Sequence, residues 1–127
     1  MRDAAAFAAE WEAAWNAHDL DAVMAHHAED VLFRSNKAVP IAGTAEIRGK
    51  AALRAYWAEA LARQPYLRFT VQQVFEGPDM PVIAYGNHRG VRAAETLRFG
   101  PDGLVVEGSA CHAPVAGRGR GDDPASP

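Results

Sequence analysis

The stretch Trp15-Asn-Ala-His-Asp-Leu-Asp-Ala-Val-Met-Ala-His-His-Ala-Glu-Asp-Val-Leu-Phe33 decides the fold of this chain. It predicts the end of one helix, a tight turn, and a second helix that leads into a strand. Asp19 is placed to cap the second helix, because its carboxylate can accept hydrogen bonds from the unpaired amides of the first turn. One buried face of that helix is predicted from four residues at helical spacing, which are Leu20, Val23, Met24 and His27. A helical hairpin that runs directly into a strand gives a frame on which a curved sheet can fold back.

Two further segments have the spacing of amphipathic helices. Residues 3 to 17 carry an apolar stripe made of Phe7, Trp11, Ala14 and Trp15. Residues 50 to 64 carry a second stripe made of Leu53, Tyr56, Trp57, Ala60 and Leu61, and Pro65 ends that helix. Residues 36 to 49 lack a sustained period, so we expect a loop there that covers the mouth of a cavity.

From residue 67 onward the apolar period changes to two, which is typical of strands. The first strand is predicted to turn Leu67, Phe69, Val71 and Phe75 to its inner face, with Gln73 interrupting that face. Strands at about 81–88, 92–99 and 104–113 follow, and Gly100-Pro-Asp-Gly103 is a strong turn between the last two. The fold class is therefore α+β, with three N-terminal helices packed on one face of an antiparallel sheet.

Composition and charge exclude some classes of function and indicate where the protein works. The chain has 127 residues, of which 49% are hydrophobic and 23% charged, and this describes one globular domain over residues 1–113. Residues 114–127 have nothing to bury and are predicted to be disordered. A net charge of −3 gives no basic face for nucleic acid, and no apolar run is long enough for a membrane span. The single cysteine, Cys111, and the absence of a signal peptide favour the cytoplasm.

Four segments together resemble the SnoaL-like branch of the nuclear transport factor 2-like (NTF2-like) superfamily. They are Trp15-Asn-Ala-His-Asp-Leu-Asp21, His26-His-Ala-Glu-Asp-Val-Leu-Phe33, Ile47-Arg-Gly-Lys-Ala-Ala-Leu-Arg-Ala-Tyr-Trp57 and Glu95-Thr-Leu-Arg-Phe-Gly-Pro-Asp-Gly-Leu-Val105. The resemblance implies a curved sheet that forms a cone-shaped pocket for a small, largely apolar molecule, often in a homodimer. Members include polyketide cyclases, ketosteroid isomerases, dehydratases, epoxide hydrolases and proteins without known activity, so the fold alone does not fix a reaction.

The resemblance also allows the acid/base positions of the ketosteroid isomerases to be compared one at a time. The position of their oxyanion-binding tyrosine looks like Trp11, and the position of their general base looks like Ser35. Their neutral, hydrogen-bonding aspartate looks like Glu95. One of the three positions therefore keeps its chemical kind, which disfavours steroid-isomerase chemistry.

Two residues remain as candidates for proton transfer, Glu95 and His27. His27 has two readings, a core histidine with its hydrogen bonds satisfied or an acid/base group in the pocket. Glu95 shares a strand face with Ala93, Leu97 and Phe99 and should point inward, either paired with protonated His27 or unpaired with a raised pKa. We favour the unpaired form, because no Lys or Arg shares that strand face.

The expected pocket lining is a set of aromatic and polar side chains: Trp11, Trp15, Phe33, Tyr56, Trp57, Phe69, Gln73, Phe75, Tyr85 and His112. No cofactor is expected, and no metal site, because no two histidines are spaced i, i+4 on a helix. Two functions stay open. The domain is either an enzyme that uses Glu95 and a histidine on a small apolar molecule, or a non-catalytic binding or dimerisation module whose pocket is filled by its own aromatic side chains.

Overall fold

The computed structural model describes residues 2–114 of the chain. The tail was predicted to be disordered over residues 114–127. All of these residues except 114 lie outside the described range, so the disorder stays a prediction. In order, the elements within the described range are α1 (Ala4–Asn16), α2 (Leu20–Met24), β1 (His27–Ser35), the 3-10 helix η1 (Asn36–Ala38), α3 (Val39–Ala42), β2 (Glu46–Arg48), α4 (Lys50–Arg63), β3 (Phe69–Gly77), β4 (Met80–Asn87), β5 (Arg92–Phe99) and β6 (Val105–His112).

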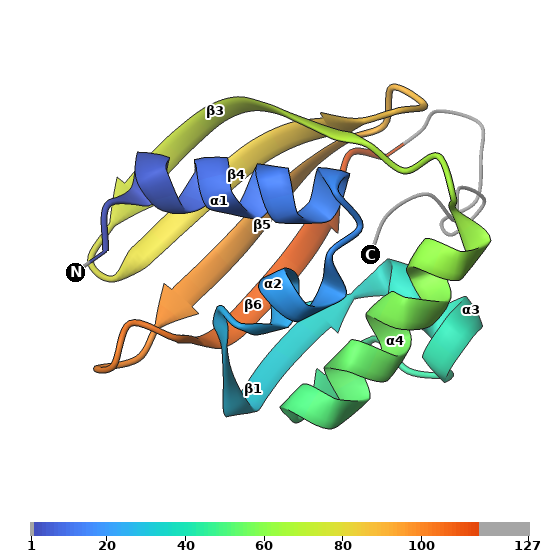
Figure 1. Cartoon of the computed structure of the whole chain (residues 1–127), viewed down its shortest axis with the longest axis horizontal. Coiled ribbons are helices and arrows are strands. Elements are labelled where there is room, and N and C mark those ends of the chain that lie inside the picture. The colour runs from blue at the N-terminus through green and yellow to red at the C-terminus, as the bar shows by residue number, and fades with distance from the viewer. Residues whose placement is uncertain (1, 115–127) are drawn as a thin grey trace.

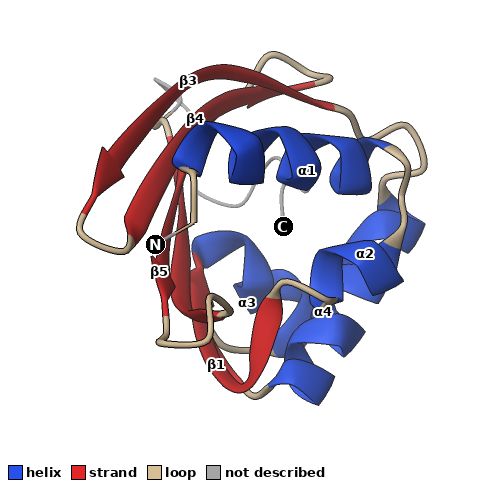
Figure 2. Cartoon of the chain, turned by 60° about the vertical axis from the view of Figure 1, so that its left-hand side comes forward, coloured by secondary structure: helices blue, strands red, loops and turns tan. Residues whose placement is uncertain are grey.

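The six strands form one sheet in the order β2-β1-β6-β5-β4-β3. All neighbouring pairs are antiparallel except β1 and β6, which run parallel. The sheet curves strongly, and α1 and α4 lie on the same, concave side of it (Figures 1 and 2). The predicted α+β class, with N-terminal helices on a curved sheet, is therefore confirmed. The parallel pair places the first strand in the sequence, β1, beside the last, β6.

Helices α1 and α2 each begin at a capping aspartate. The Asp3 carboxylate accepts a hydrogen bond from the Ala6 amide at 2.8 Å, and the Asp19 carboxylate accepts one from the Ala22 amide at 3.1 Å. The apolar stripe of α1 is buried, as is that of α4, in which Leu53, Tyr56, Trp57 and Ala60 face the sheet. Both stripes were readable because apolar residues three and four apart lie on one side of a helix.

The second helix is shorter than predicted, and its end changes the place of His27. Helix α2 stops at Met24, and His27 is the first residue of β1 rather than the last residue of a helix face. The His26 carbonyl accepts a hydrogen bond from the Val105 amide at 2.8 Å, so the backbone at this point pairs with β6. The prediction of a helical His27 was wrong, because a long-range strand partner outweighs a helical period of four residues.

A bulge in β3 turns two predicted inner residues outward. The register with β4 passes from Val71↔Tyr85 to Gln73↔Ala84, so Gln72 is one extra residue on β3. After an extra residue the alternation of faces reverses. Gln73 is exposed, and Phe75 is 51% exposed while Val74 takes the inner side. The inward placement of Gln73 and Phe75 was wrong for this reason.

The segment predicted as a loop has structure of its own. It contains η1, α3 and the edge strand β2, which pairs antiparallel with β1. Helix α3 buries none of its residues and ends at Gly43, whose φ of 80° is in the left-handed region that favours glycine. Figure 1 shows α3 beside α4, at the end of the curved sheet where β1 finishes.

Candidate functional site

The candidate site is centred on Glu95, a carboxyl group buried in the middle of the sheet. Glu95 lies on β5 opposite Ile83 of β4 and Ala110 of β6, and it is 1% exposed. Its predicted inward orientation is confirmed. The Tyr85 hydroxyl donates a hydrogen bond to its Oε1 at 3.5 Å, the long limit for such a bond. No Lys, Arg or His within the described range forms an ion pair with it.

Burial controls the ionisation of this carboxyl group. Desolvation raises the pKa of Glu95 to about 8, and the hydrogen bond from Tyr85 opposes the rise. Burial also raises the pKa of Tyr85, and the neighbouring Glu95 adds to that rise. Glu95 is therefore protonated at neutral pH and can donate a hydrogen bond, which an ionised carboxylate cannot do.

A second hydroxyl approaches the same region from α4. Burial raises the pKa of Tyr56 above its ordinary range, a hydrogen-bonding contact with Ser35 lowers it, and the charge of Glu95 raises it. The Tyr56 hydroxyl is therefore near both groups, although it makes no hydrogen bond of standard geometry among the described residues. Ser35 is the last inward residue in the alternation Val31, Phe33, Ser35 on β1. That period of two was the signal that could have placed Ser35 in the site.

Aromatic rings surround these polar groups and form one connected cluster. The Tyr85 ring lies 4.7 Å from Phe69 and 5.0 Å from Trp11, measured between ring centroids. Trp57 lies 5.1 Å from Trp15 and 5.1 Å from Phe33. The predicted lining residues that belong to the buried core are Trp11, Trp15, Phe33, Tyr56, Trp57, Phe69 and Tyr85.

Several donors in this cluster have nothing to donate to. The indole N–H groups of Trp15 and Trp57 and the Tyr56 hydroxyl are buried without a hydrogen-bond partner among the described residues. Buried donors are normally satisfied, so each unsatisfied one calls for a partner, such as water or a ligand. The interior therefore holds three buried side-chain donors, from Trp15, Tyr56 and Trp57, that could serve a ligand.

His27 does not join Glu95. Its ring Nδ1 donates to the Val23 carbonyl at 2.9 Å, and its ring lies edge-on to Trp57 at 5.2 Å. Burial lowers the pKa of His27 to about 4, and the bond to the Val23 carbonyl opposes the change. The charges that act on it belong to His26 and Lys50. Its surroundings are those of a neutral core histidine whose donor is satisfied. His27 therefore does not form the ion pair with Glu95 that was the alternative prediction.

Of the other predicted lining residues, one lies on the inner face of the sheet and two lie on the outer face. His112 is half-buried at the end of β6, opposite Ala93 on the inner face. Gln73 and Phe75 lie on the outer face beyond the bulge and do not reach the aromatic cluster.

In residues 2–114, no group of three or more His, Cys, Asp or Glu side chains is arranged to hold a metal ion. Within the same range, none of the helices combines the length and apolar character that crossing a membrane requires.

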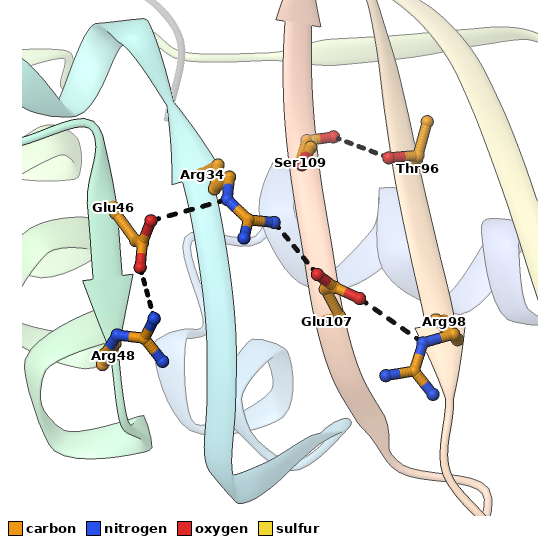
Figure 3. A network of polar contacts seen from close by, with 7 residues as sticks. All are labelled: Arg34, Glu46, Arg48, Thr96, Arg98, Glu107 and Ser109. Atoms are coloured by element: carbon orange, nitrogen blue, oxygen red, sulfur yellow. Dashed lines mark hydrogen bonds and ion pairs between the residues drawn. The ribbon is translucent and has the colours of Figure 1, made fainter.

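The outer face of the sheet has the opposite chemistry. Arg34 bridges Glu46 at 3.6 Å and Glu107 at 2.9 Å, and Arg98 reaches the other oxygen of Glu107 at 3.4 Å (Figure 3). Arg48 extends the row by pairing with Glu46 at 2.6 Å. The hydrogen bonds from Arg34 and Arg98 lower the pKa of Glu107. Charges on this face are paired with one another across four strands, whereas the inner carboxyl has no cation.

Comparisons with known proteins agree with this architecture. A family model described as "SnoaL-like domain" matches residues 8–110. A SnoaL-like protein of unknown function from Burkholderia thailandensis is 42% identical, with 87% of this chain and 95% of that chain covered and a TM-score of 0.82. An NTF2-like protein of unknown function from Mesorhizobium loti is 25% identical, with coverage of 87% and 91% and a TM-score of 0.69.

A third similar structure is TerC, which was co-crystallised with polyporic acid. It is 14% identical, with 84% of this chain and 88% of that chain covered and a TM-score of 0.69, and at this identity the likeness concerns the fold alone. No protein with a curated description matches the sequence.

Proposed function

Because the chain belongs to the SnoaL-like family of the NTF2-like superfamily, we propose that it binds a small, largely apolar molecule in the interior of the curved sheet, beside Glu95. The ligand carries a hydrogen-bond acceptor, such as a carbonyl oxygen, that accepts a hydrogen bond from the protonated carboxyl group of Glu95. TerC, which shares the fold, was crystallised with polyporic acid, and this supports a small organic molecule as the kind of ligand.

The observation that carries the proposal is the unpaired burial of Glu95. A carboxyl group 1% exposed and without a cation costs free energy to bury, and a structure that only needed to pack would be more stable with an apolar residue there. Protonated Glu95, the Tyr56 hydroxyl and the two unsatisfied indoles are all donors. A bound acceptor beside Glu95 would give the proton of this acid a partner, and the nearby Tyr56 hydroxyl is a second donor to it.

The chemistry that this arrangement supports is stabilisation of negative charge on the ligand oxygen. A neutral acid that donates a strong hydrogen bond in an apolar site lowers the energy of an enolate-like oxygen. Glu95 would hold or transfer that proton, and Tyr85 would orient the carboxyl group. His27 is assigned no part in proton transfer, because its Nδ1 donor is bound to a backbone carbonyl and its pKa is low.

The second candidate is a non-catalytic module whose interior is filled by its own side chains. It is favoured by one observation, which is that the aromatic rings next to Glu95 contact one another at 4.7–5.3 Å. In that case Glu95 would have no ligand, and its burial would destabilise the folded state without serving a function.

A thermal-shift screen against polyketide-like and terpenoid compounds tests the proposal. We expect compounds with a carbonyl group to raise the melting temperature of the wild type at pH 6 and to lose most of that effect at pH 9.5, where Glu95 is ionised. Glu95→Leu should abolish the shift. Glu76→Gln, which changes an exposed carboxylate on β3, should retain it. If no compound of either class produces a shift that depends on Glu95, the proposal is wrong and the filled-interior alternative stands.

We also propose that the chain forms a homodimer in the cytoplasm. The outer sheet face presents mixed charges, including Arg98 and Glu107, and also carries the exposed Phe75, and a mixed face can pair with a second copy of itself. Sedimentation that gives only monomer at micromolar concentration would contradict the dimer.

A further inference from the structure

A groove of about 440 Å³ opens on the surface between α3, β2 and α4. Its lining consists of Ile41, Ala42, Thr44, Glu46, Ile47, Arg48, Ala52, Ala55, Tyr56 and Glu59. The α4 side of the groove is made of small side chains one turn apart, Ala52 and Ala55, which leave it open. This volume is within the range of small-molecule pockets.

The floor of the groove is also the wall of the buried site. Ile47 and Tyr56 line the groove and are members of the hydrophobic core. Tyr56 is 3% exposed, and its hydroxyl lies on the inner side, near Ser35 and Glu95. The Tyr56 side chain therefore borders both the open surface groove and the region of the buried carboxyl group.

The two sides of the groove are held differently. The Tyr56 ring is buried in the core, and its hydroxyl has a hydrogen-bonding contact with Ser35 that it gives up when the ring turns. Helix α3, on the other side of the groove, has no buried residue and no side-chain cap, and it ends at a left-handed glycine, Gly43. Few buried contacts and an uncapped short helix are the features of segments that open locally at low cost.

We propose that this groove is the entrance to the interior site and that Tyr56 is the side chain that moves aside to admit the ligand. This inference rests on the proposed function, because it assumes that a ligand reaches Glu95. In it, the apolar body of the ligand first lies against Ile41, Ile47 and the alanines of α4. Rotation of the Tyr56 ring then opens the way to Glu95.

Binding kinetics of an apolar fluorophore with one carbonyl group, 6-propionyl-2-dimethylaminonaphthalene, test the entrance. Ala55→Phe and Ala52→Phe fill the groove from exposed positions of α4. Ala58→Phe is the matched control, since Ala58 is exposed on the same helix but does not line the groove. Both kinds of variant change the same residue type to the same residue at solvent-exposed helix positions, so their effects on folding should match.

We expect the association and dissociation rate constants of Ala55→Phe and Ala52→Phe to fall together by roughly tenfold, with Kd little changed, because a gate alters a barrier and not the two end states. Ala58→Phe should bind at the wild-type rate. Wild-type rates in all three variants would overturn the entrance while leaving the proposed site intact. Weaker affinity with an unchanged association rate would place the probe in the groove itself and would also overturn it. Failure of the wild type to bind the probe saturably, or binding that Glu95→Leu leaves unchanged, would overturn the entrance together with the proposed site.

Discussion

Glu95 and Glu107 lie on neighbouring strands of one sheet and have opposite surroundings. Glu95 faces the concave side, has no cation, and has its pKa raised to about 8 by burial. Glu107 faces the outer side, where hydrogen bonds from Arg34 and Arg98 lower its pKa (Figure 3). The same side chain is thus a neutral donor on one face and a paired anion on the other. The face of the strand, rather than the residue type, decides the chemistry.

The pattern on each face follows from its solvent. On the outer face water screens the charges, so an ion pair adds little to stability and costs little to lose. On the inner face an ionised carboxyl group without a partner destabilises the folded state, and protonation reduces that destabilisation. Three predictions test this contrast.

The largest effect is expected from breaking the aromatic wall of the inner face. Trp57→Ala should lower the free energy of unfolding by about 3–5 kcal/mol, because it removes a buried indole that contacts Trp15, Phe33 and His27. Urea denaturation followed by circular dichroism measures the change. Tyr66→Ala, at a residue 83% exposed, is the control and should alter stability by less than about 0.5 kcal/mol. A loss below about 1 kcal/mol for Trp57→Ala would mean that α4 does not present this face to the core.

The next effect concerns the proton on Glu95. Its folded pKa of about 8 is above the ordinary value of 4.5, so the native state holds a proton that the unfolded state releases. The stability that this proton contributes is fully present below pH 4.5 and is lost as the pH rises through about 8. Between pH 5 and pH 9 the wild type should lose roughly 2–4 kcal/mol relative to Glu95→Gln, which keeps a donor but cannot ionise.

Urea midpoints of the wild type and Glu95→Gln across that pH range provide the measurement. The two curves should diverge as the pH rises, with the variant the more stable protein at the alkaline end. Parallel curves would show that the Glu95 carboxyl group is solvated, and the buried acid would then have to be abandoned.

The smallest effect is expected on the outer face. The pKa of Glu107 is lowered in the folded state, so its contribution to stability is present above its unfolded pKa and is lost as the pH falls through the folded value. Glu107→Gln should therefore cost a little stability at pH 7, less at pH 3, and less in high salt. This pH dependence has the opposite sign to that of Glu95. Equal changes in urea midpoint at both pH values would show that the Arg34 and Arg98 contacts do not stabilise the fold.

Much of the fold could be predicted because its signals are local. The apolar stripe of α4 predicted a helix over residues 50–64, and the structure has it at Lys50–Arg63. The strand around Glu95 was predicted at 92–99 and is found at Arg92–Phe99. Alternation on an uninterrupted strand fixes which side chains face inward, and this is why the burial of Glu95 was readable without a structure.

The site was less predictable wherever long-range pairing changes a local period. The extra residue Gln72 sends Phe75 to the outer face, and pairing of the His26 carbonyl with β6 moves His27 from a helix into a strand. No local sequence pattern predicted the bulge in β3 or the early end of α2, because each is fixed by a strand partner far away in the sequence. The same holds for the approach of Tyr56 to Ser35 and Glu95, which come from three separate elements.

The sequence by itself determined the two long helices, the strand alternation around Glu95, the capping role of Asp19 and the inward side of Glu95, since each depends on residues within a few positions of one another. Only the tertiary structure decided that Glu95 has no cation, that the His27 Nδ1 donor bonds to a backbone carbonyl, and that Tyr56 lines the groove and is also near the buried acid. Desolvation and hydrogen-bond satisfaction depend on every group around an atom. Those groups come from elements far apart in the sequence, such as β1, α4 and β5, and the period of a sequence cannot supply their distances.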